Sequence, residues 1–242
     1  MILKELPASV GDRGRTVPLS PLSPEKEIIM AHHIENYVVG PVGTNCYFFV
    51  NDETKEMVVI DPGASAKALY EKIKEGGYIP KGILLTHGHF DHAGGARGLL
   101  ELMGLDGYDV EIYALDIERE TLEDPRYNLS GMMGGTNERY KATVYVHDGD
   151  VLHLAGFELK VLFTPGHTPG GCCFYCEKEG VLFSGDTLFC SSVGRTDFPG
   201  GSMSALLRAI REKLLVLPDG TVVYPGHDSM TTIADERQNP FL

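Results

Sequence analysis

The sequence has no apolar stretch long enough to cross a membrane and no surplus of positive charge. A membrane-spanning helix needs about 18 consecutive apolar residues, and no run in this chain approaches that length. The 242 residues contain 21 lysines and arginines against 34 aspartates and glutamates, which gives a formal net charge of −13. Binding to RNA or DNA depends on many Lys and Arg contacts with phosphates. We therefore expect no membrane span and no nucleic-acid partner.

Cysteine is also scarce, and an odd, low number of cysteines does not suggest a disulfide framework. The five positions are Cys46, Cys172, Cys173, Cys176 and Cys190. Cys173 and Cys176 form a C-x-x-C pair, which could indicate a redox or zinc motif. However, residues 172–176 have the pattern of a strand, where residues three apart lie on opposite faces, about 10 Å from each other. A disulfide needs Cα atoms within about 7 Å. We interpret these cysteines as small buried side chains, and free thiols fit a cytoplasmic protein.

The first 31 residues lack any clear periodicity. They contain Pro7, Pro18, Pro21 and Pro24 among glycine, serine and charged residues, which predicts a flexible N-terminal extension over residues 1–31. A signal peptide needs a continuous apolar core of about seven or more residues, and none is present. No internal repeat and no second core pattern follow. Residues 32–242 are therefore predicted to form one domain, and that length is ample for a sizeable core.

Strand and helix signals alternate through this domain, which indicates the α/β class. The predicted strands are residues 37–39, 46–50, 57–60, 82–85, 111–113, 143–146, 151–154, 157–163, 172–176, 181–183 and 221–223. The predicted helices are residues 64–75, 93–103, 116–123, 203–217 and 232–238, with Ser202 as a cap. Residues 126–140 contain Gly131, Gly134 and Gly135 and show no pattern. They are interpreted either as a mobile loop over a site or as a packed surface loop.

Four potential metal ligands lie within six positions, in Thr-His-Gly-His-Phe-Asp-His-Ala-Gly-Gly at residues 86–95. His87 and His89 are two apart, so in an extended segment their side chains leave the same face. Asp91 and His92 come where the chain turns into a predicted helix. All four would crowd one tetrahedral ion, whereas two adjacent ions could share them. The alternative is a polar loop without metal. It is disfavoured because each buried histidine needs a hydrogen-bonding partner, and this loop contains three histidines.

Three further positions repeat the same arrangement, in which a strand signal ends and one His or Asp follows beside a glycine. His167 lies in Thr-Pro-Gly-His-Thr-Pro-Gly-Gly, Asp186 in Ser-Gly-Asp-Thr, and His227 in Tyr-Pro-Gly-His-Asp. Glycine allows a close backbone approach, and loops at strand ends commonly carry function. Each position alone would be a weak signal, but together with residues 86–95 they indicate a dinuclear metal site.

The order H-x-H-x-D-H, then His, Asp and His, resembles the ligand order of the metallo-β-lactamase superfamily, and the resemblance runs from about Ile34 to the C-terminus. It implies a four-layer αββα fold with the metals at one edge of the paired sheets. It also implies how the ligands divide between the ions. His87, His89 and His167 would hold the first ion, Asp91, His92 and His227 would hold the second, and Asp186 would bridge both.

Residues 194–201, Gly-Arg-Thr-Asp-Phe-Pro-Gly-Gly, narrow the resemblance to glyoxalase II and its single-domain relatives. Two-domain glyoxalase II continues past its last histidine into a helical domain that helps bind glutathione, whereas the present sequence ends at Leu242. Arg195 and Asp197 also stand in the region where that enzyme uses a lysine and a tyrosine near glutathione. The metal chemistry is therefore expected to carry over, and the glutathione specificity is not.

These ligand types suit zinc, with iron or manganese as alternatives. The resemblance implies a metal-dependent hydrolase in which a metal-bridged hydroxide cleaves hydroxyacyl-glutathione or a related small-molecule thioester. Asp91 would orient the hydroxide and accept a proton. Arg195 is expected either to bind a substrate carboxylate or to form a structural salt bridge with Asp197. The oligomeric state and the thiol carrier stay open.

Two competing hypotheses come from other classes of protein. Persulfide dioxygenases, which use a single iron, share the fold, the histidine motif and a Gly-Arg-Thr-Asp-Phe stretch, and they are the principal alternative. The Pro-Gly-His before Asp228 resembles the hydrolases more closely. A non-enzymatic metal-binding relative is disfavoured because all seven ligand positions are occupied by ligand residues.

Overall fold

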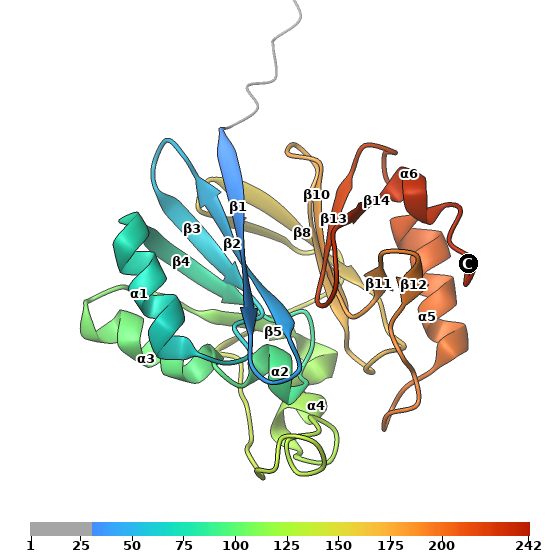
Figure 1. Ribbon diagram of the computed structural model, residues 1–242, viewed down its shortest axis with the longest axis horizontal. Helices are drawn as coiled ribbons and strands as arrows, with labels where there is room; N and C mark the ends of the chain where they lie inside the picture. Colours follow the sequence, from blue (N-terminus) through green and yellow to red (C-terminus); the bar gives the residue numbers. More distant parts are fainter. Residues whose placement is uncertain (1–30) are drawn as a thin grey trace, which may run out of the picture.

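The computed structural model describes residues 31–242, so residues 1–30 of the predicted extension lie outside the described part. Two six-stranded sheets face each other in it (Figure 1). The first sheet has the order β1-β2-β3-β4-β5-β6. Its strands are β1 His32–Val39, β2 Thr44–Asn51, β3 Glu56–Ile60, β4 Ile79–Leu84, β5 Ile112–Leu115 and β6 Val144–Val146.

The second sheet has the order β14-β13-β10-β9-β8-β7. Its strands are β7 Val151–Leu154, β8 Phe157–Phe163, β9 Cys172–Cys176, β10 Val181–Gly185, β13 Val222–Pro225 and β14 Thr231–Thr232. A short ribbon, β11 Leu188–Phe189 and β12 Ser192–Val193, stands beside it. β4 runs parallel to β3 and β5, and β10 runs parallel to β13. Loops that leave the carboxyl ends of these strands therefore meet at one edge of the molecule.

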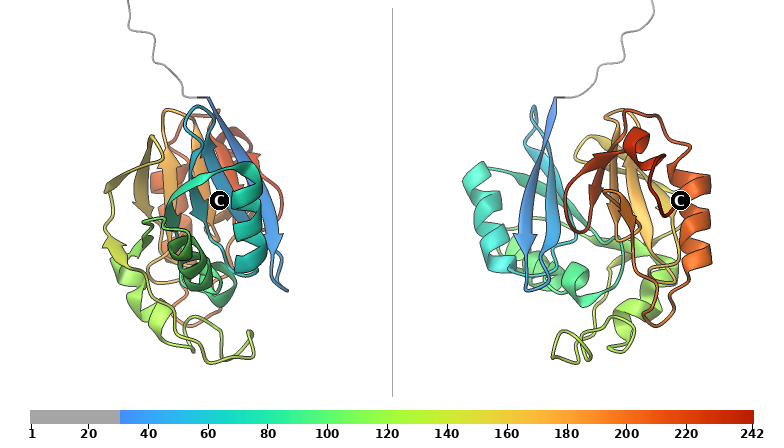
Figure 2. Two further views of the ribbon diagram at one scale, coloured as in Figure 1. Left: turned by 90° about the vertical axis from the view of Figure 1, so that its left-hand side faces the viewer. Right: turned by 45° about the vertical axis from the view of Figure 1, so that its right-hand side comes forward.

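Helices cover the outer face of each sheet (Figure 2). On the first sheet lie α1 Ala66–Gly76 and α3 Ala96–Leu105, and on the second lie α5 Met203–Ala209, a π-helical turn Ile210–Leu214, and α6 Ile233–Glu236. Three short helices lie nearer the edge: α2 Phe90–Ala93, the 3₁₀ turn η1 Asp116–Glu118, and α4 Arg119–Glu123. Three apolar clusters separate the layers, one under each helical layer and one between the sheets. The four-layer αββα prediction is confirmed.

The core between the two sheets is rich in aromatic rings. Phe49 of β2 stacks on Phe157 of β8 with ring centroids 3.7 Å apart, and Phe183 of β10 lies 5.6 Å from Phe49. All three side chains are at most 1% exposed. Large rings of this kind supply much of the apolar area that a domain buries. They hold the two sheets together.

The prediction of one helix over residues 93–103 is wrong in its boundaries. The chain forms α2 and α3 instead, with a break at Gly94 and Gly95. A Cβ atom on Gly95 would lie 2.4 Å from the backbone oxygen of Pro62, so the turn after β3 packs directly against the break. This close approach fixes the ligand-bearing loop against the first sheet, and the hydrophobic periodicity of the helix gives no sign of it.

Two other helices are shorter than predicted. The predicted helix over 203–217 starts at its expected cap, where Ser202 Oγ accepts a hydrogen bond from Ala205 N at 3.3 Å, but its α-helical part ends at Ala209 and continues as the π-helical turn. The predicted helix over 232–238 is limited to α6, and Thr232 caps it by accepting from Asp235 N.

The prediction for the cysteines is confirmed. Cys173 packs in the cluster under α5, whereas Cys172 and Cys176 pack in the cluster between the sheets, so the C-x-x-C pair points to opposite faces of β9. All five cysteines are free thiols, and only Cys190 is exposed. Within residues 31–242, no helix has the length and apolar character that crossing a membrane requires.

Candidate metal centre

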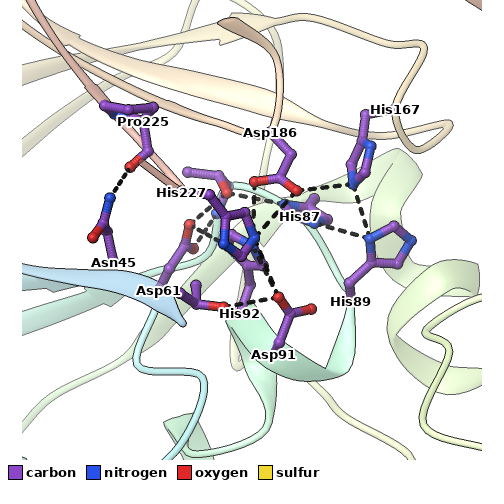
Figure 3. Close-up of polar contacts among 12 residues, drawn as sticks. Asn45, Asp61, His87, His89, Asp91, His92, His167, Asp186, Pro225 and His227 are labelled. Carbon is purple, nitrogen blue, oxygen red and sulfur yellow. Dashed lines mark hydrogen bonds and ion pairs between the residues drawn. The ribbon is translucent and has the colours of Figure 1, made fainter. Parts of the chain in front are cut away.

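Four loops bring the seven predicted ligands to one place at the edge between the two sheets (Figure 3). His87 and His89 lie in the loop after β4, and Asp91 and His92 lie in α2, directly after it. His167 follows β8, Asp186 follows β10 and His227 follows β13. Each loop leaves a buried strand, so the positions of the side chains are set by the sheets and not by the loops alone.

The first cluster consists of His87, His89 and His167, whose side chains are nearly fully buried. Nε2 of His87 lies 3.1 Å from Nδ1 of His89, and Nε2 of His167 lies 2.9 Å from the same atom. Two ligands of a tetrahedral zinc ion, each about 2.0–2.1 Å from the metal, would be about 3.3 Å apart. The three nitrogens are therefore spaced closely enough to be ligands of one ion.

The second cluster consists of Asp91, His92 and His227. Nε2 of His92 lies 3.6 Å from Oδ2 of Asp91, and Nε2 of His227 lies 3.4 Å from the same oxygen. Asp186 lies between the two clusters. Its Oδ2 is 3.4 Å from Nε2 of His167 and 3.6 Å from Nε2 of His227, and its Oδ1 is 3.3 Å from Nε2 of His92. The position of Asp186 is therefore that of a shared ligand.

The hydrogen bonds behind the first cluster show which nitrogens carry protons. His167 Nδ1 donates to the backbone oxygen of Arg195 at 2.7 Å, so its Nε2 presents a lone pair. Thr86 Oγ1 donates to Asp61 Oδ2 at 2.6 Å and therefore accepts from His87 Nδ1 at 3.1 Å. Nε2 of His87 then also presents a lone pair. Two lone pairs converge on His89 Nδ1, which can offer at most one proton, and such a cluster fits a cation.

The second cluster passes a similar test. His92 Nδ1 donates to Asp61 Oδ2 at 2.9 Å, and its Nε2 faces the oxygens of Asp91 and Asp186. Burial alone would lower the pKa of His92, but the carboxylates of Asp186, Asp91 and Asp61 outweigh it and raise the pKa, so without metal both ring nitrogens carry protons. Within the described chain, His92 Nε2 and Asp186 Oδ1 are buried and make no hydrogen bond. Buried polar atoms are rarely left without a partner. Two carboxylates that face one buried imidazole need positive charge between them, and a divalent ion that displaces the proton of His92 Nε2 would supply it.

The protonation states suit metal binding. Burial lowers the pKa of His87, His89 and His167 below the usual value for histidine, so these imidazoles are neutral at pH 7. Burial alone would raise the pKa of Asp186, but His92 and the other histidines outweigh it and lower the pKa to about 2. Burial would likewise raise the pKa of Asp91, but His92 and two hydrogen bonds outweigh it, so that pKa is lowered. Neutral imidazoles and ionised carboxylates are the forms that bind metals.

Asp61 is a functional residue that the sequence reasoning missed. It is 1% exposed and lies just past the end of β3. Its Oδ1 accepts from Thr86 N at 2.8 Å, and its Oδ2 accepts from the Thr86 hydroxyl and from His92 Nδ1. It therefore orients ligands of both clusters. The signal that could have found it is an aspartate at the end of a buried strand, the same arrangement that marks Asp186, but Asp-Pro-Gly at residues 61–63 also has the pattern of an ordinary turn.

β2 of the first sheet also holds the ligand residues in place. The Thr44 hydroxyl donates to Asp91 Oδ2 at 2.8 Å. Asn45 Nδ2 donates to the backbone oxygen of Pro225 at 3.0 Å (Figure 3). It also donates to the backbone oxygen of Asp228 at 3.0 Å, so its two partners stand on either side of His227 in the sequence. Partners of this kind fix the orientation of metal ligands, and their loss typically weakens metal binding about 10–100-fold.

A cavity of about 350 Å³ opens over the two clusters, and five of the seven predicted ligands contribute to its wall. Phe198 lies over the first cluster, with its ring 5.6 Å from that of His89, and Phe189 lies 6.2 Å from His227. The remaining wall is largely apolar: Val42, Phe90, Leu129, Met133 and Val193. The volume falls in the range that small-molecule sites occupy.

The segment without a sequence pattern, residues 126–140, borders this cavity through Leu129 and Met133. Its base is packed. Asn128 is fully buried and donates from Nδ2 to the backbone oxygens of Leu122 and Glu138 at 3.0 Å each, and its own backbone oxygen accepts from Phe90 N at 2.8 Å. The segment was expected to be either a mobile loop over a site or a packed surface loop. Its base is packed, as the second interpretation has it, and the segment does lie beside the site.

Arg195 lies on the rim of the cavity, where it forms the salt bridge that was expected as one of its two roles. Its Nε and Nη2 donate to the two carboxylate oxygens of Asp197 at 2.8 and 2.7 Å, and its guanidinium carbon lies 4.1 Å from the centre of the Phe198 ring. Both charged side chains are more than half exposed. Binding of a substrate carboxylate by Arg195 stays a prediction.

Residues 39–227 match the model of the metallo-β-lactamase superfamily. Together with the αββα layers and the two His/Asp clusters, this match places the chain in that superfamily, whose members are metallo-hydrolases that bind divalent metals.

The more specific likeness is to short members of the superfamily. The chain is 40% identical over 206 residues to the probable metallo-hydrolase YqgX of Bacillus subtilis (strain 168), covering 84% of this chain and 94% of the relative. It is 38% identical over 217 residues to the hydroxyacylglutathione hydrolase GloC of Haemophilus influenzae, covering 87% and 98%.

Solved structures agree with this likeness. The B3 metallo-β-lactamase BLEG-1 superposes with a TM-score of 0.79 and 40% identity, covering 87% of this chain and 99% of its own. TTHA1623 in a di-iron-bound form superposes with a TM-score of 0.73 and 34% identity, covering 86% and 100%. ETHE1 from Myxococcus xanthus superposes with a TM-score of 0.67 and 26% identity, covering 86% of this chain and 82% of its own.

Proposed function

We propose that this protein is a dinuclear metal-dependent hydrolase of the glyoxalase II kind, which cleaves a hydroxyacyl thioester. The observation that carries the proposal is the meeting of two ligand clusters at Asp186, at the base of a cavity of small-molecule size. The similarity to GloC supports the thioester as the substrate class. In the proposed assignment, His87, His89 and His167 hold one ion, Asp91, His92 and His227 hold the other, and Asp186 is shared.

Zinc is the proposed metal, because imidazole and carboxylate ligands without thiolates suit it. Iron and manganese accept the same ligands, and the similar protein TTHA1623 has been solved in a di-iron-bound form. When bound, two divalent ions supply hydroxide at neutral pH and a positive charge beside the substrate oxygen on which negative charge develops.

Asp91 has the clearest catalytic role among the residues of the chain. The Thr44 hydroxyl fixes its Oδ2, and His227 stands 3.4 Å away on the other side. Its lowered pKa keeps it ionised, so it can accept a hydrogen bond from the attacking water and orient it. A thiolate leaves with a pKa of about 8.5, so the leaving group needs little help from a general acid.

The cavity wall suggests a substrate with a modest anionic part. Among the described residues that line the cavity, Arg195 is the one arginine or lysine, and Asp197 already pairs with two of its donor atoms. The other contacts on offer are apolar, from residues such as Phe90, Met133 and Phe198. We therefore propose that the acyl thioester is recognised more than the glutathione part, and that neutral thiol carriers are accepted.

The test is a comparison of two thioesters that share one acyl group. Lactoyl-glutathione and the neutral lactoyl-N-acetylcysteamine would be supplied to the purified metal-loaded protein, and thiol release would be followed. We expect hydrolysis of both, with kcat/KM values within about tenfold of each other. Asp186→Ala serves as the inactive control.

Two further assays cover the other reactions of the superfamily. Oxygen uptake with glutathione persulfide, without turnover of either thioester, would identify an oxidoreductase and overturn the hydrolase proposal. Cleavage of a chromogenic β-lactam in place of both thioesters would keep the hydrolase and overturn the substrate class.

A further inference from the structure

Glu118 is a buried carboxylate that belongs to neither ligand cluster. It is the last residue of η1 and is 1% exposed. Its Oε1 accepts a hydrogen bond from Gly88 N at 2.8 Å, and its Oε2 accepts one from Gly170 N at 2.7 Å. Both oxygens of one side chain are thus bonded to the backbones of two separate loops.

These two loops deliver the whole first cluster. Gly88 stands between His87 and His89, and Gly170 follows His167 by three residues. The distance between the loops sets the distance between the imidazole nitrogens, which is 2.9 Å for His89 and His167. A carboxylate that bonds both loops therefore controls the spacing on which metal binding depends.

The segment that carries Glu118 packs closely against the backbones of both loops. A Cβ atom on Gly170 would lie 2.3 Å from the backbone nitrogen of Glu118, and a Cβ atom on Gly88 would lie 2.9 Å from the backbone nitrogen of Leu122. The segment formed by η1 and α4 thus lies directly against the backbone of both loops. Only glycine permits this approach at the two bonded positions.

A buried carboxylate is a costly choice for a merely structural position. Burial raises the pKa of Glu118, against the backbone N–H groups that favour its charged form. An apolar side chain of similar size would avoid that cost, but it could not accept two hydrogen bonds. The arrangement is therefore suited to a task in which two donors must be held at a fixed separation.

We propose that Glu118 is a positioning residue for the first metal cluster, and that it holds the loops of His87, His89 and His167 at their ligand spacing before an ion binds. This inference rests on the metal-binding part of the proposed function and is independent of the substrate.

The principal test is zinc affinity in a background that isolates the first cluster. His227→Ala weakens the second cluster, so the zinc ion that this variant still binds tightly belongs to the first cluster. Competition with a chromophoric chelator then measures the zinc affinity of the first cluster. Glu118→Gln keeps the shape of the side chain but can accept only one of the two N–H groups. Loss of such a partner of metal ligands typically weakens metal binding about 10–100-fold, and we expect that loss here.

Glu236→Gln in the same background is the matched control. Glu236 is also 1% exposed and accepts hydrogen bonds from Ser191 N, Thr231 Oγ1 and Asn239 Nδ2, away from both histidine loops. We expect it to lower the melting temperature of the metal-free protein about as much as Glu118→Gln, with unchanged zinc affinity. If the two variants lose stability alike and both bind zinc like their parent, Glu118 is structural and the proposal is overturned.

Hydrogen exchange in the unmutated, metal-free protein provides a second test that needs no variant to fold. If Glu118 holds the loops in advance, the amides of Gly88 and Gly170 stay protected without metal. Rapid exchange that slows only when zinc is added would mean that the ion organises the loops, and it would overturn the inference. Failure of the parent chain to bind zinc at all, with both amides protected, would instead refute the metal centre of the proposed function.

Discussion

Replacement of Asp61 by asparagine should damage both the stability of the metal-free protein and its second metal cluster. Asp61 accepts three hydrogen bonds, two from Thr86 and one from His92 Nδ1. Its φ angle is 49°, in the left-handed region, which asparagine tolerates better than most residues. The substitution therefore changes the hydrogen bonds and leaves the backbone conformation accessible.

The size of the effect follows from the acceptor count. With its amide oxygen in the place of Oδ2, the asparagine side chain of Asp61→Asn would keep the bonds from the Thr86 hydroxyl and His92, but it would turn an NH₂ group toward Thr86 N. One lost bond to a charged acceptor costs about 1.5–3 kcal/mol. The two bonds that remain lose their charge assistance and weaken by roughly half, so the free energy of unfolding should fall by about 3–6 kcal/mol. For a protein of this size that corresponds to a melting temperature lower by about 6–24 °C.

The metal prediction is separate. His92 would donate to a neutral oxygen instead of a carboxylate, and such changes typically weaken metal binding about 10–100-fold. Elemental analysis and chelator titration measure it. Asp52→Asn is the matched control, because Asp52 also accepts from a histidine, His33 Nδ1, but both side chains are more than one third exposed. That exposed pair contributes less than about 1 kcal/mol. If the Asp61 variant kept its melting temperature and both metals, the assigned role of Asp61 would be refuted.

The remaining predictions concern the shared ligand, the cavity rim and the thiols. Asp186→Ala should lose both metals and His227→Ala mainly the second, and equal metal content in the two variants would contradict the assignment of Asp186 as the bridge. Arg195→Ala should raise KM for lactoyl-glutathione several-fold with kcat and metal content little changed. If kcat/KM fell equally for lactoyl-N-acetylcysteamine, the salt bridge with Asp197 would be the whole role of Arg195. Iodoacetamide at pH 8 should label the native protein once, at the exposed Cys190, because burial raises the pKa of Cys173 to about 11 and the other thiols are buried. Mass spectrometry of the native and the unfolded protein after labelling checks this prediction. Labelling of Cys173 in the native protein would count against the fold of β9.

The candidate ligands could be recognised from sequence because each carries its own chemical signal. His167 and Asp186 are side chains that bind metals, and each follows a buried strand whose end is marked by glycine. The strand pattern and the residue type together indicated loops at strand ends, and the resemblance to the superfamily implied that these loops meet at one edge of the paired sheets. The resemblance to the superfamily then supplied their division between two clusters.

The helix boundaries around the site could not be predicted in the same way. The break at Gly94 and Gly95 exists because the backbone of Pro62 packs against it from more than thirty positions earlier in the chain. Hydrophobic periodicity reports which face of a helix is buried, and it continues smoothly across this break. Contacts between backbones leave no mark in the side-chain pattern except the glycine itself.

The buried carboxylates show the same limit at the level of function. Asp91 and Asp186 face histidine nitrogens across the base of the cavity, and their side chains are 11% exposed. Asp61 and Glu118 are 1% exposed, and most of their partners are backbone N–H groups and a hydroxyl. An ion that enters through the cavity can reach the first pair, whereas the second pair is already saturated with hydrogen bonds from the protein. Because any residue except proline supplies a backbone N–H, the sequence names no partner for Asp61 or Glu118. Their role follows only from where the sheets place the ligand loops.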